Sequence, residues 1–317
     1  MSTAPSPPPI FGRIGVIGVG LIGSSLVRAA METGAAQSVS LWDQDPSTLA
    51  RAAELGLGEP AASLAEAVSQ ADAVFLCMPV GALATTGALC AGSMKDGAIL
   101  TDVGSVKASV AKDLRTLSRP GLHVIPGHPI AGTEKSGPDA GFASLFRGRW
   151  CILTPEPDGD KDYLSAVEAL TRFWERLGSR VELMDAARHD LVLAITSHVP
   201  HLIAYNICST AADLEAVTQG EVVKFSAAGF RDFTRIAASD PTMWRDVFLN
   251  NREAVLEILG RFNEDLTALQ RAIRWGEGDL LFDVFTRARG VRQSIIEAGQ
   301  DTAAPNFGRD VPAAPKP

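Results

Sequence analysis

Cysteine is scarce in this 317-residue sequence, and no two cysteines stand near each other. The four, Cys77, Cys90, Cys151 and Cys208, include no C-x-x-C pair, which excludes a disulfide framework and the common cysteine zinc motifs. Cys77 and Cys151 lie inside apolar runs. We therefore expect buried free thiols in a reducing compartment.

The chain also lacks an excess of positive charge and a long apolar run. Its formal net charge is -8 at pH 7, so no overall basic field would gather a nucleic acid. No segment reaches the roughly 18 uninterrupted apolar residues of a membrane helix, and the N-terminus lacks the basic-then-apolar layout of a signal peptide. We expect a cytoplasmic protein with no nucleic-acid partner and no membrane partner.

What the sequence does contain is an alternation of short apolar runs with helical patterns, from Phe11 to Leu183. This alternation predicts right-handed βαβ crossovers and hence a doubly wound parallel sheet. After Leu183 the strand signal stops, and long helices are expected. The predicted strands are 13–18, 38–43, 73–77, 98–102, 122–125, 150–153 and 180–183, and the clearest predicted helices are 161–177 and 241–273.

These patterns predict an α/β Rossmann domain over 11–184 and an all-helical domain over 185–300. A 46% share of hydrophobic residues is enough for two cores. The ends, 1–10 and 303–317, are rich in Pro and Ala, and we expect them to be disordered. The apolar stripe along 241–273 is equally compatible with packing inside its own domain and with packing across a dimer axis.

A glycine-rich turn follows the first predicted strand. It reads Gly18-Val-Gly20-Leu21-Ile22-Gly23, and Asp43 ends the second strand about twenty residues later, as in the dinucleotide-binding fingerprint. The turn and the helix N-terminus can receive a pyrophosphate, while the Asp43 carboxylate can accept from a ribose 2′-hydroxyl and would repel a 2′-phosphate. We predict NAD as the cofactor, with further contacts from Leu21, Ile22 and Pro79.

Polar residues also follow the fourth and fifth predicted strands, where ligands bind in open parallel sheets. His128 lies between a glycine and a proline, which favours a loop and suits a general base. Ser105 follows the preceding strand; a helix N-cap explains it at least as well as a catalytic role.

The helical half holds a second polar cluster. Ser197 and His201 are four residues apart and therefore share one helical face. His198 and His201 alone do not complete a metal site, so no metal is expected. Arg235 stands in an apolar stretch and is a candidate for a substrate carboxylate, although an internal ion pair is equally compatible. We interpret His123 and His189 as structural.

Taken in order, these segments resemble the prephenate and arogenate dehydrogenases, also called cyclohexadienyl dehydrogenases. The matching segments span 11–298 and are 18–23, Asp102-Val-Gly-Ser-Val-Lys107, His128-Pro-Ile-Ala-Gly-Thr-Glu134, Ser197-His-Val-Pro-His201 and Phe230-Arg-Asp-Phe-Thr-Arg235. The resemblance implies NAD-dependent oxidative decarboxylation in tyrosine biosynthesis, by a homodimer joined through the helical domain, with the active site between the two domains.

The resemblance also assigns roles to individual residues. It implies that His128 engages the ring hydroxyl of prephenate or arogenate and that Ser105 orients it beside the nicotinamide. It implies that Arg235 holds a substrate carboxylate. The same resemblance places four further residues around the pocket: Ser197, His201, Glu134 and Trp244.

Two other functions fit parts of the sequence. A β-hydroxyacid dehydrogenase also joins a Rossmann domain to helices, but it needs a catalytic lysine in the helical half. That half contains two lysines, Lys224 and Lys316, and Lys316 lies in the tail. A non-catalytic NAD sensor would use the same glycine turn and would need none of the polar residues at the strand ends.

Overall fold

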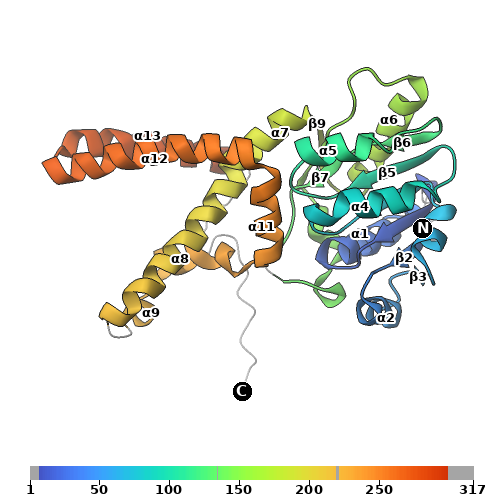
Figure 1. The fold of residues 1–317 in the computed structure, drawn as a ribbon, viewed down its shortest axis with the longest axis horizontal. Coiled ribbons are helices and arrows are strands. Elements are labelled where there is room, and N and C mark those ends of the chain that lie inside the picture. The colour runs from blue at the N-terminus through green and yellow to red at the C-terminus, as the bar shows by residue number, and fades with distance from the viewer. Residues whose placement is uncertain (1–6, 134, 219–220, 299–317) are drawn as a thin grey trace, which may run out of the picture. The chain divides into compact units, whose positions relative to one another are not determined.

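The computed structural model describes residues 7–133, 135–218 and 221–298. Contacts divide the chain into two compact units, the first ending at Ile258 and the second beginning at Leu259. Figure 1 shows the order of the elements along the chain. All candidate site residues that the structure describes lie in the first unit.

The first unit is built on a six-stranded parallel sheet with the order β3-β2-β1-β4-β5-β6. This is the order of a doubly wound Rossmann sheet, so the predicted fold class is confirmed. The strands are β1 (Phe11–Ile17), β2 (Ala36–Trp42), β3 (Glu59–Pro60), β4 (Ala73–Leu76), β5 (Ala98–Asp102) and β6 (Leu122–Val124).

Helices cover both faces of this sheet, because its central strands are apolar on both sides. One core joins the sheet to α1 (Leu21–Glu32) and α6 (Lys161–Arg176), and it includes aromatic rings in tilted and edge-to-face contact, namely Phe75, Phe173 and Trp174. The other core joins it to α3 (Leu64–Ser69), α4 (Val80–Ala91) and α5 (Ala108–Arg115). Helix α2 (Pro46–Glu54) follows β2.

A second, three-stranded sheet lies after β6, and it corrects the expectation that His128 lies in a loop. The sheet has the order β7-β8-β9, in which β8 (Trp150–Leu153) and β9 (Arg180–Leu183) are the two predicted strands. Strand β7 (Gly127–Pro129) pairs antiparallel with β8 and places His128 opposite Ile152. His128 is therefore a buried strand residue, because pairing with a distant segment overrides the local turn signal of its glycine and proline neighbours.

The helical part of the first unit begins with an almost continuous run of helix. It consists of α7 (Ala186–Leu193), the π-helical turn η3 (Ala194–His198) and α8 (Val199–Thr218). The segment 186–214 is long and apolar enough, by length and composition alone, to cross a membrane. Here it carries His189, Asp190 and His198, all buried within the first unit. Shorter helices follow at α9 (Glu221–Lys224), α10 (Ala228–Thr234) and η4 (Arg235–Ala238).

The predicted single helix over 241–273 is wrong in one respect, because it is interrupted. Helix α11 (Pro241–Asn250) ends at Asn251, whose backbone leaves the helical region at φ −109° and ψ 38°, and α12 (Arg252–Trp275) then starts. The Asn251 side chain is buried and donates to the carbonyl oxygen of Asp190 at 2.9 Å. A tertiary hydrogen bond thus accompanies a break that the apolar periodicity did not indicate.

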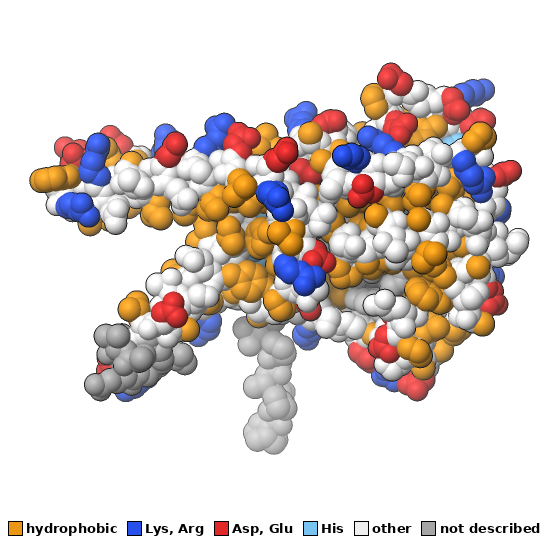
Figure 2. Space-filling view, in the orientation of Figure 1, with side chains coloured by type: hydrophobic (Ala, Val, Ile, Leu, Met, Phe, Trp, Pro, Cys, Tyr) orange, Lys and Arg blue, Asp and Glu red, His pale blue; other side chains and the backbone are white. Residues whose placement is uncertain are grey.

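The second unit comprises the rest of α12 and helix α13 (Gly278–Glu297). Large apolar side chains are exposed on both helices, among them Trp275, Phe282 and Phe285. Figure 2 shows hydrophobic side chains exposed along these helices. Of the ends predicted to be disordered, 1–6 and 303–317 lie outside the described residues, whereas Pro8 accepts a hydrogen bond from Arg176 and Ile10 donates one to Ala35.

Candidate active site

The glycine turn between β1 and α1 has the geometry of a phosphate cradle. Gly18 has φ +93°, and a side chain there would collide with the carbonyl oxygen of Cys77; a side chain at Gly23 would collide with Gly18. A Cβ atom at Gly20, in contrast, would meet nothing within 4 Å. Gly18 and Gly23 are therefore required by packing, while Gly20 leaves open space beside the backbone.

Asp43 completes this cradle at the end of β2. Its Oδ2 accepts from the Val19 backbone amide at 2.8 Å, which holds the carboxylate against the glycine turn. Helix α1 begins at Leu21 without any side-chain cap on its first amides, so its N-terminus can receive an anion. Pro79 is the N-cap of α4, directly after β4. These residues fit a dinucleotide: open space beside Gly20 for the pyrophosphate and a carboxylate for the ribose.

The loop from β5 to α5 contains Ser105, and the structure excludes the N-cap reading of that residue. The N-cap of α5 is Lys107, and its side chain makes no capping bond. The amides of Lys107 and Ala108 donate instead to the two carboxylate oxygens of Asp190, at 2.7 and 2.8 Å. The helix is thus capped by a residue 83 positions away.

A buried ion pair holds the same loop against β7. The ammonium group of Lys107 contacts the Asp102 carboxylate, both side chains being fully buried, and also donates to the carbonyl oxygen of Gly127 at 2.7 Å. Asp102 accepts from the amides of Gly104 and Gly127 as well. This network fixes the strand that carries His128.

His128 is buried, with 8% of its surface exposed, and it forms a hydrogen bond through one edge of its ring. Its Nδ1 lies 2.8 Å from Nε2 of His189, and Nδ1 of His189 lies 2.8 Å from Oδ1 of Asp190. No partner of His128 Nε2 is found in the part of the chain that the structure describes. His128 therefore offers Nε2 to a ligand.

Burial lowers the pKa of His128 well below its ordinary value; His189 and His198, when protonated, and the positive charge of Lys107 lower it further. Burial also lowers the pKa of His189, although its hydrogen bond to Asp190 opposes this. Both rings are therefore neutral near neutral pH, and a neutral imidazole can accept a proton.

His198 lies beside these rings in the π-helical turn. Its Nδ1 lies 3.0 Å from the Asn251 amide nitrogen, which donates to it, while its Nε2 has no well-aligned partner among the described residues. Burial lowers the pKa of His198 to about 4, with opposing contributions from Asp190 and from the backbone of Ser105. His198 is therefore neutral at physiological pH.

A second group of residues surrounds His201. Its ring stacks on Trp244 with centroids 3.8 Å apart, and its Nδ1 donates to the carbonyl oxygen of Ser197 at 2.8 Å. Burial lowers the pKa of His201, and the nearby charge of Arg235 lowers it further. The Trp244 indole N–H is buried without a partner among the described residues.

The two groups of residues are electrostatic neighbours. Protonation of His198 would lower the pKa of His128, and protonation of His201 would lower the pKa of His198. Ser105, His128, Trp244, His201 and Arg235 are thereby linked through adjacent groups in the first unit. Glu134 lies outside the described residues. Within them, no group of three or more His, Cys, Asp or Glu side chains could hold a metal ion.

Sequence reasoning interpreted His189 as structural and did not single out Asp190, so it missed the contacts that join both residues to His128 and to the start of α5. A histidine followed directly by an aspartate at the first turns of a helix carries no motif of its own. The available signal was the run Arg188-His189-Asp190 directly before an apolar segment, since polar groups that become buried need partners.

Comparison with known proteins identifies the family. Residues 26–183 match the nucleotide-binding domain of prephenate dehydrogenase, and residues 185–287 match its dimerization domain. The cyclohexadienyl dehydrogenase of Zymomonas mobilis is 40% identical over 287 residues, covering 90% of this chain and 97% of that protein. The prephenate dehydrogenase of Bacillus subtilis is 30% identical and covers 88% and 74% respectively.

A solved structure agrees with this. The prephenate dehydrogenase of A. aeolicus, in complex with hydroxyphenyl propionate and NAD+, superimposes with a TM-score of 0.82 at 32% identity, covering 90% of this chain and 98% of that one. The Synechocystis arogenate dehydrogenase gives a TM-score of 0.74 at 27% identity, with coverages of 89% and 99%. The chain belongs to the prephenate dehydrogenase family.

Proposed function

We propose that this chain is an NAD-dependent oxidoreductase that converts prephenate, arogenate or both into 4-hydroxyphenylpyruvate or tyrosine by oxidative decarboxylation. The observation that carries the proposal is a neutral His128 with an available Nε2, set in the same unit as a glycine turn that fits a dinucleotide. When bound, NAD supplies the hydride acceptor.

The chain's own residues then position the substrate and handle its proton. His128 Nε2 accepts the proton of the ring hydroxyl, and Ser105 orients that hydroxyl. Arg235 holds a substrate carboxylate, while Ser197, His201, Glu134 and Trp244 line the pocket. The Trp244 stack on His201 keeps the imidazole in one plane, and the positive charge of Arg235 beside that ring supports an anion site there.

The cofactor contacts come from residues 18–23, Asp43, Pro79 and Ser105. The support is the open space at Gly20, the uncapped start of α1 and the Asp43 carboxylate fixed on the turn. A 2′-phosphate would meet the negative charge of Asp43, so NAD is favoured over NADP.

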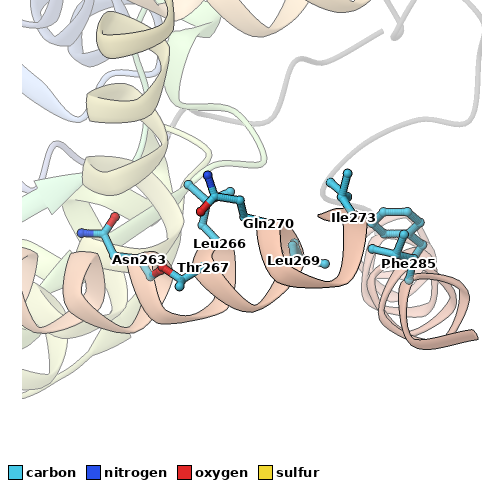
Figure 3. A pocket seen from close by; sticks show the side chains of 8 residues that line it. Asn263, Leu266, Thr267, Leu269, Gln270, Ile273 and Phe285 are labelled. Carbon is cyan, nitrogen blue, oxygen red and sulfur yellow. The ribbon is translucent and has the colours of Figure 1, made fainter. Parts of the chain in front are cut away.

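The functional enzyme is a homodimer joined through its helical domain. In the second unit, Trp275 and Phe282 are each 71% exposed, which is unusual for large apolar side chains of a monomer. Figure 3 shows a pocket of this unit, formed by residues of α12 and α13 and lined by apolar side chains such as Leu266, Ile273 and Phe285 together with polar ones from Asn263, Thr267 and Gln270. A second copy would bury this surface.

We keep the division into domains at 11–184 and 185–300. The two family matches meet between residues 183 and 185, and Asp185 caps the first helix of the second part. The compact units divide later, at Ile258, because Trp244 and Val247 of α11 join the core formed with α4 and α5.

The net charge of -8 and the four free cysteines favour a cytoplasmic location.

Steady-state kinetics on prephenate and arogenate, each with NAD and with NADP, tests the proposal. Reduction followed at the nicotinamide absorbance is expected with NAD and at least one of the two substrates. Turnover of a small β-hydroxy acid without turnover of either cyclohexadiene would favour the β-hydroxyacid dehydrogenase, and no turnover of any of them would favour the NAD sensor. Sedimentation of the wild type and of Phe282→Asp tests the dimer, since the variant is expected to shift toward monomer.

A further inference from the structure

Three side chains from two separate elements of the chain form a line of hydrogen bonds that ends at His128. His128 comes from β7, and His189 and Asp190 come from α7. Nδ1 of His128 lies 2.8 Å from Nε2 of His189, and Nδ1 of His189 lies 2.8 Å from Oδ1 of Asp190. All three residues are less than 9% exposed, so water cannot substitute for these bonds.

Asp190 fixes the direction of the line, because both of its oxygens are held as acceptors. Oδ1 accepts from the Lys107 amide and Oδ2 accepts from the Ala108 amide. A backbone amide can only donate, and the N-terminus of a helix favours an ionised carboxylate. Oδ1 of Asp190 is therefore a hydrogen-bond acceptor toward His189 as well.

This acceptor determines the position of the proton on each ring. Nδ1 of His189 faces Oδ1 of Asp190, so it must carry the proton, and a neutral His189 then has a bare Nε2. That bare nitrogen faces Nδ1 of His128, which must in turn donate. The Nε2 atom of His128 is left without a proton. Burial keeps both rings neutral, and the nearby Lys107 ammonium and His198 disfavour added positive charge on His128.

We propose that His189 and Asp190 are positioning residues that hold His128 in its Nδ1–H tautomer and so keep its Nε2 as a proton acceptor. The link to catalysis rests on the proposed function, in which that atom meets the substrate's ring hydroxyl. In the other tautomer, Nε2–H would be a donor facing a hydroxyl that must lose its proton. Without the line of bonds, the two tautomers would compete in the active site.

The tautomers can be measured in the chain without substrate or cofactor. The protein has only five histidines, so ¹⁵N-histidine labelling and long-range ¹H–¹⁵N correlation give a spectrum that single substitutions can assign. We expect His128 and His189 each to show a protonated Nδ1 and a bare Nε2 at about pH 7. A protonated Nε2 on His128, or a doubly protonated His189, would overturn the proposal whether or not the enzyme turns over prephenate.

Two substitutions at position 189 separate positioning from packing. A glutamine places its amide oxygen near the site of the histidine Nε2, where it can still accept from His128. An asparagine reaches only the site of Nδ1, so it keeps the bond to Asp190 and leaves His128 Nδ1 without a partner. We expect His189→Asn to lower kcat by roughly 100-fold with little change in KM, and His189→Gln to stay within about tenfold of wild type.

The pH profile of kcat gives a further readout that a packing defect would not move. Loss of the defined tautomer changes the base, so the acid limb of the profile is expected to shift in His189→Asn and to stay near its wild-type position in His189→Gln. His123→Gln, on β6 outside the line of bonds, serves as the matched control.

Equal kcat losses in the two variants, or a kcat for His189→Asn within a few-fold of wild type, would overturn the proposal. If neither variant folds, the NMR measurement on the unaltered chain decides. A wild-type protein that turns over neither prephenate nor arogenate would refute the proposed function and would leave the tautomer result standing by itself.

Discussion

The buried histidines are expected to make the protein sensitive to acid, and His198 gives the clearest case. Its pKa is about 4 in the folded protein against an ordinary value of 6.5. Between these values the unfolded chain binds one proton that the folded chain does not bind. The free energy of unfolding is therefore not reduced by His198 above about pH 6.5, and it falls as the pH drops from there toward 4.

The size of the effect follows from this difference. One proton taken up on unfolding changes the free energy of unfolding by about 1.4 kcal/mol per pH unit. Acidification from about pH 7 to about pH 5 should thus cost about 2 kcal/mol through His198 alone. The pKa values of His128 and His189 are lowered in the same direction, so they add to the loss.

His198→Asn isolates this contribution. The Asn oxygen can take the place of Nδ1 and accept from Asn251, so the hydrogen bond survives while the titrating group is removed. The variant loses ring packing against Trp244 and is expected to be less stable at every pH. The dependence of its stability on pH, however, should be shallower than that of wild type by about 1 kcal/mol per pH unit.

Urea unfolding at several pH values between about 5 and 7, at one fixed protein concentration, measures these slopes. His123→Gln, made in the same background, controls for the loss of a histidine outside the cluster. Identical slopes for His198→Asn and wild type would refute the reasoning, because His198 would then titrate alike in the folded and unfolded states.

The remaining predictions concern catalysis and cofactor binding. His128→Asn should lower kcat by ~10²–10⁴ with little change in KM, measured by NAD reduction; a kcat within a few-fold of wild type would remove it from the mechanism. Arg235→Ala should raise the KM for substrate by roughly one to two orders of magnitude, and an unchanged KM would return it to a structural role. The kcat/KM for NAD should exceed that for NADP because of Asp43, and a preference for NADP would contradict this. Gly20→Ala should keep the wild-type melting temperature, because its methyl group meets no protein atom within 4 Å, and should weaken NAD binding, because the methyl group enters the space proposed for the pyrophosphate. Equal destabilisation by Gly20→Ala and Gly23→Ala would show that packing alone explains the turn.

Much of the Rossmann sheet could be predicted from the sequence, because its signals are local. Each central strand is a short apolar run, and the glycine turn with Asp43 fits within about 25 residues. The strands at 150–153 and 180–183 were predicted at the bounds that the structure shows. Such patterns depend only on residues that are close in the sequence, so the sequence alone is enough to predict these elements.

The errors share one cause, which is dependence on distant residues. His128 is a strand residue only because β8 pairs with it. The long helix is interrupted where Asn251 bonds to Asp190, 61 residues earlier. The N-cap role that the sequence left open for Ser105 is filled instead by Asp190, again from a distant segment. Neither a turn signal nor an apolar stripe carries such partners, so the sequence alone could not reveal them.

Asp190 joins the fold to the chemistry, because one carboxylate serves both. It caps α5 by accepting from two backbone amides, and its Oδ1 atom also accepts the hydrogen bond from Nδ1 of His189. An asparagine there would offer only one oxygen, so an amide group would face a donor either at the helix or at the imidazole. Correct proton placement on His128 is thus tied to a bond that also stabilises a Rossmann helix. If the Asp190 side chain turned away from His189, it would also leave the amides at the start of α5 without their acceptor. The orientation of His128 therefore cannot change in this way without a loss of stability.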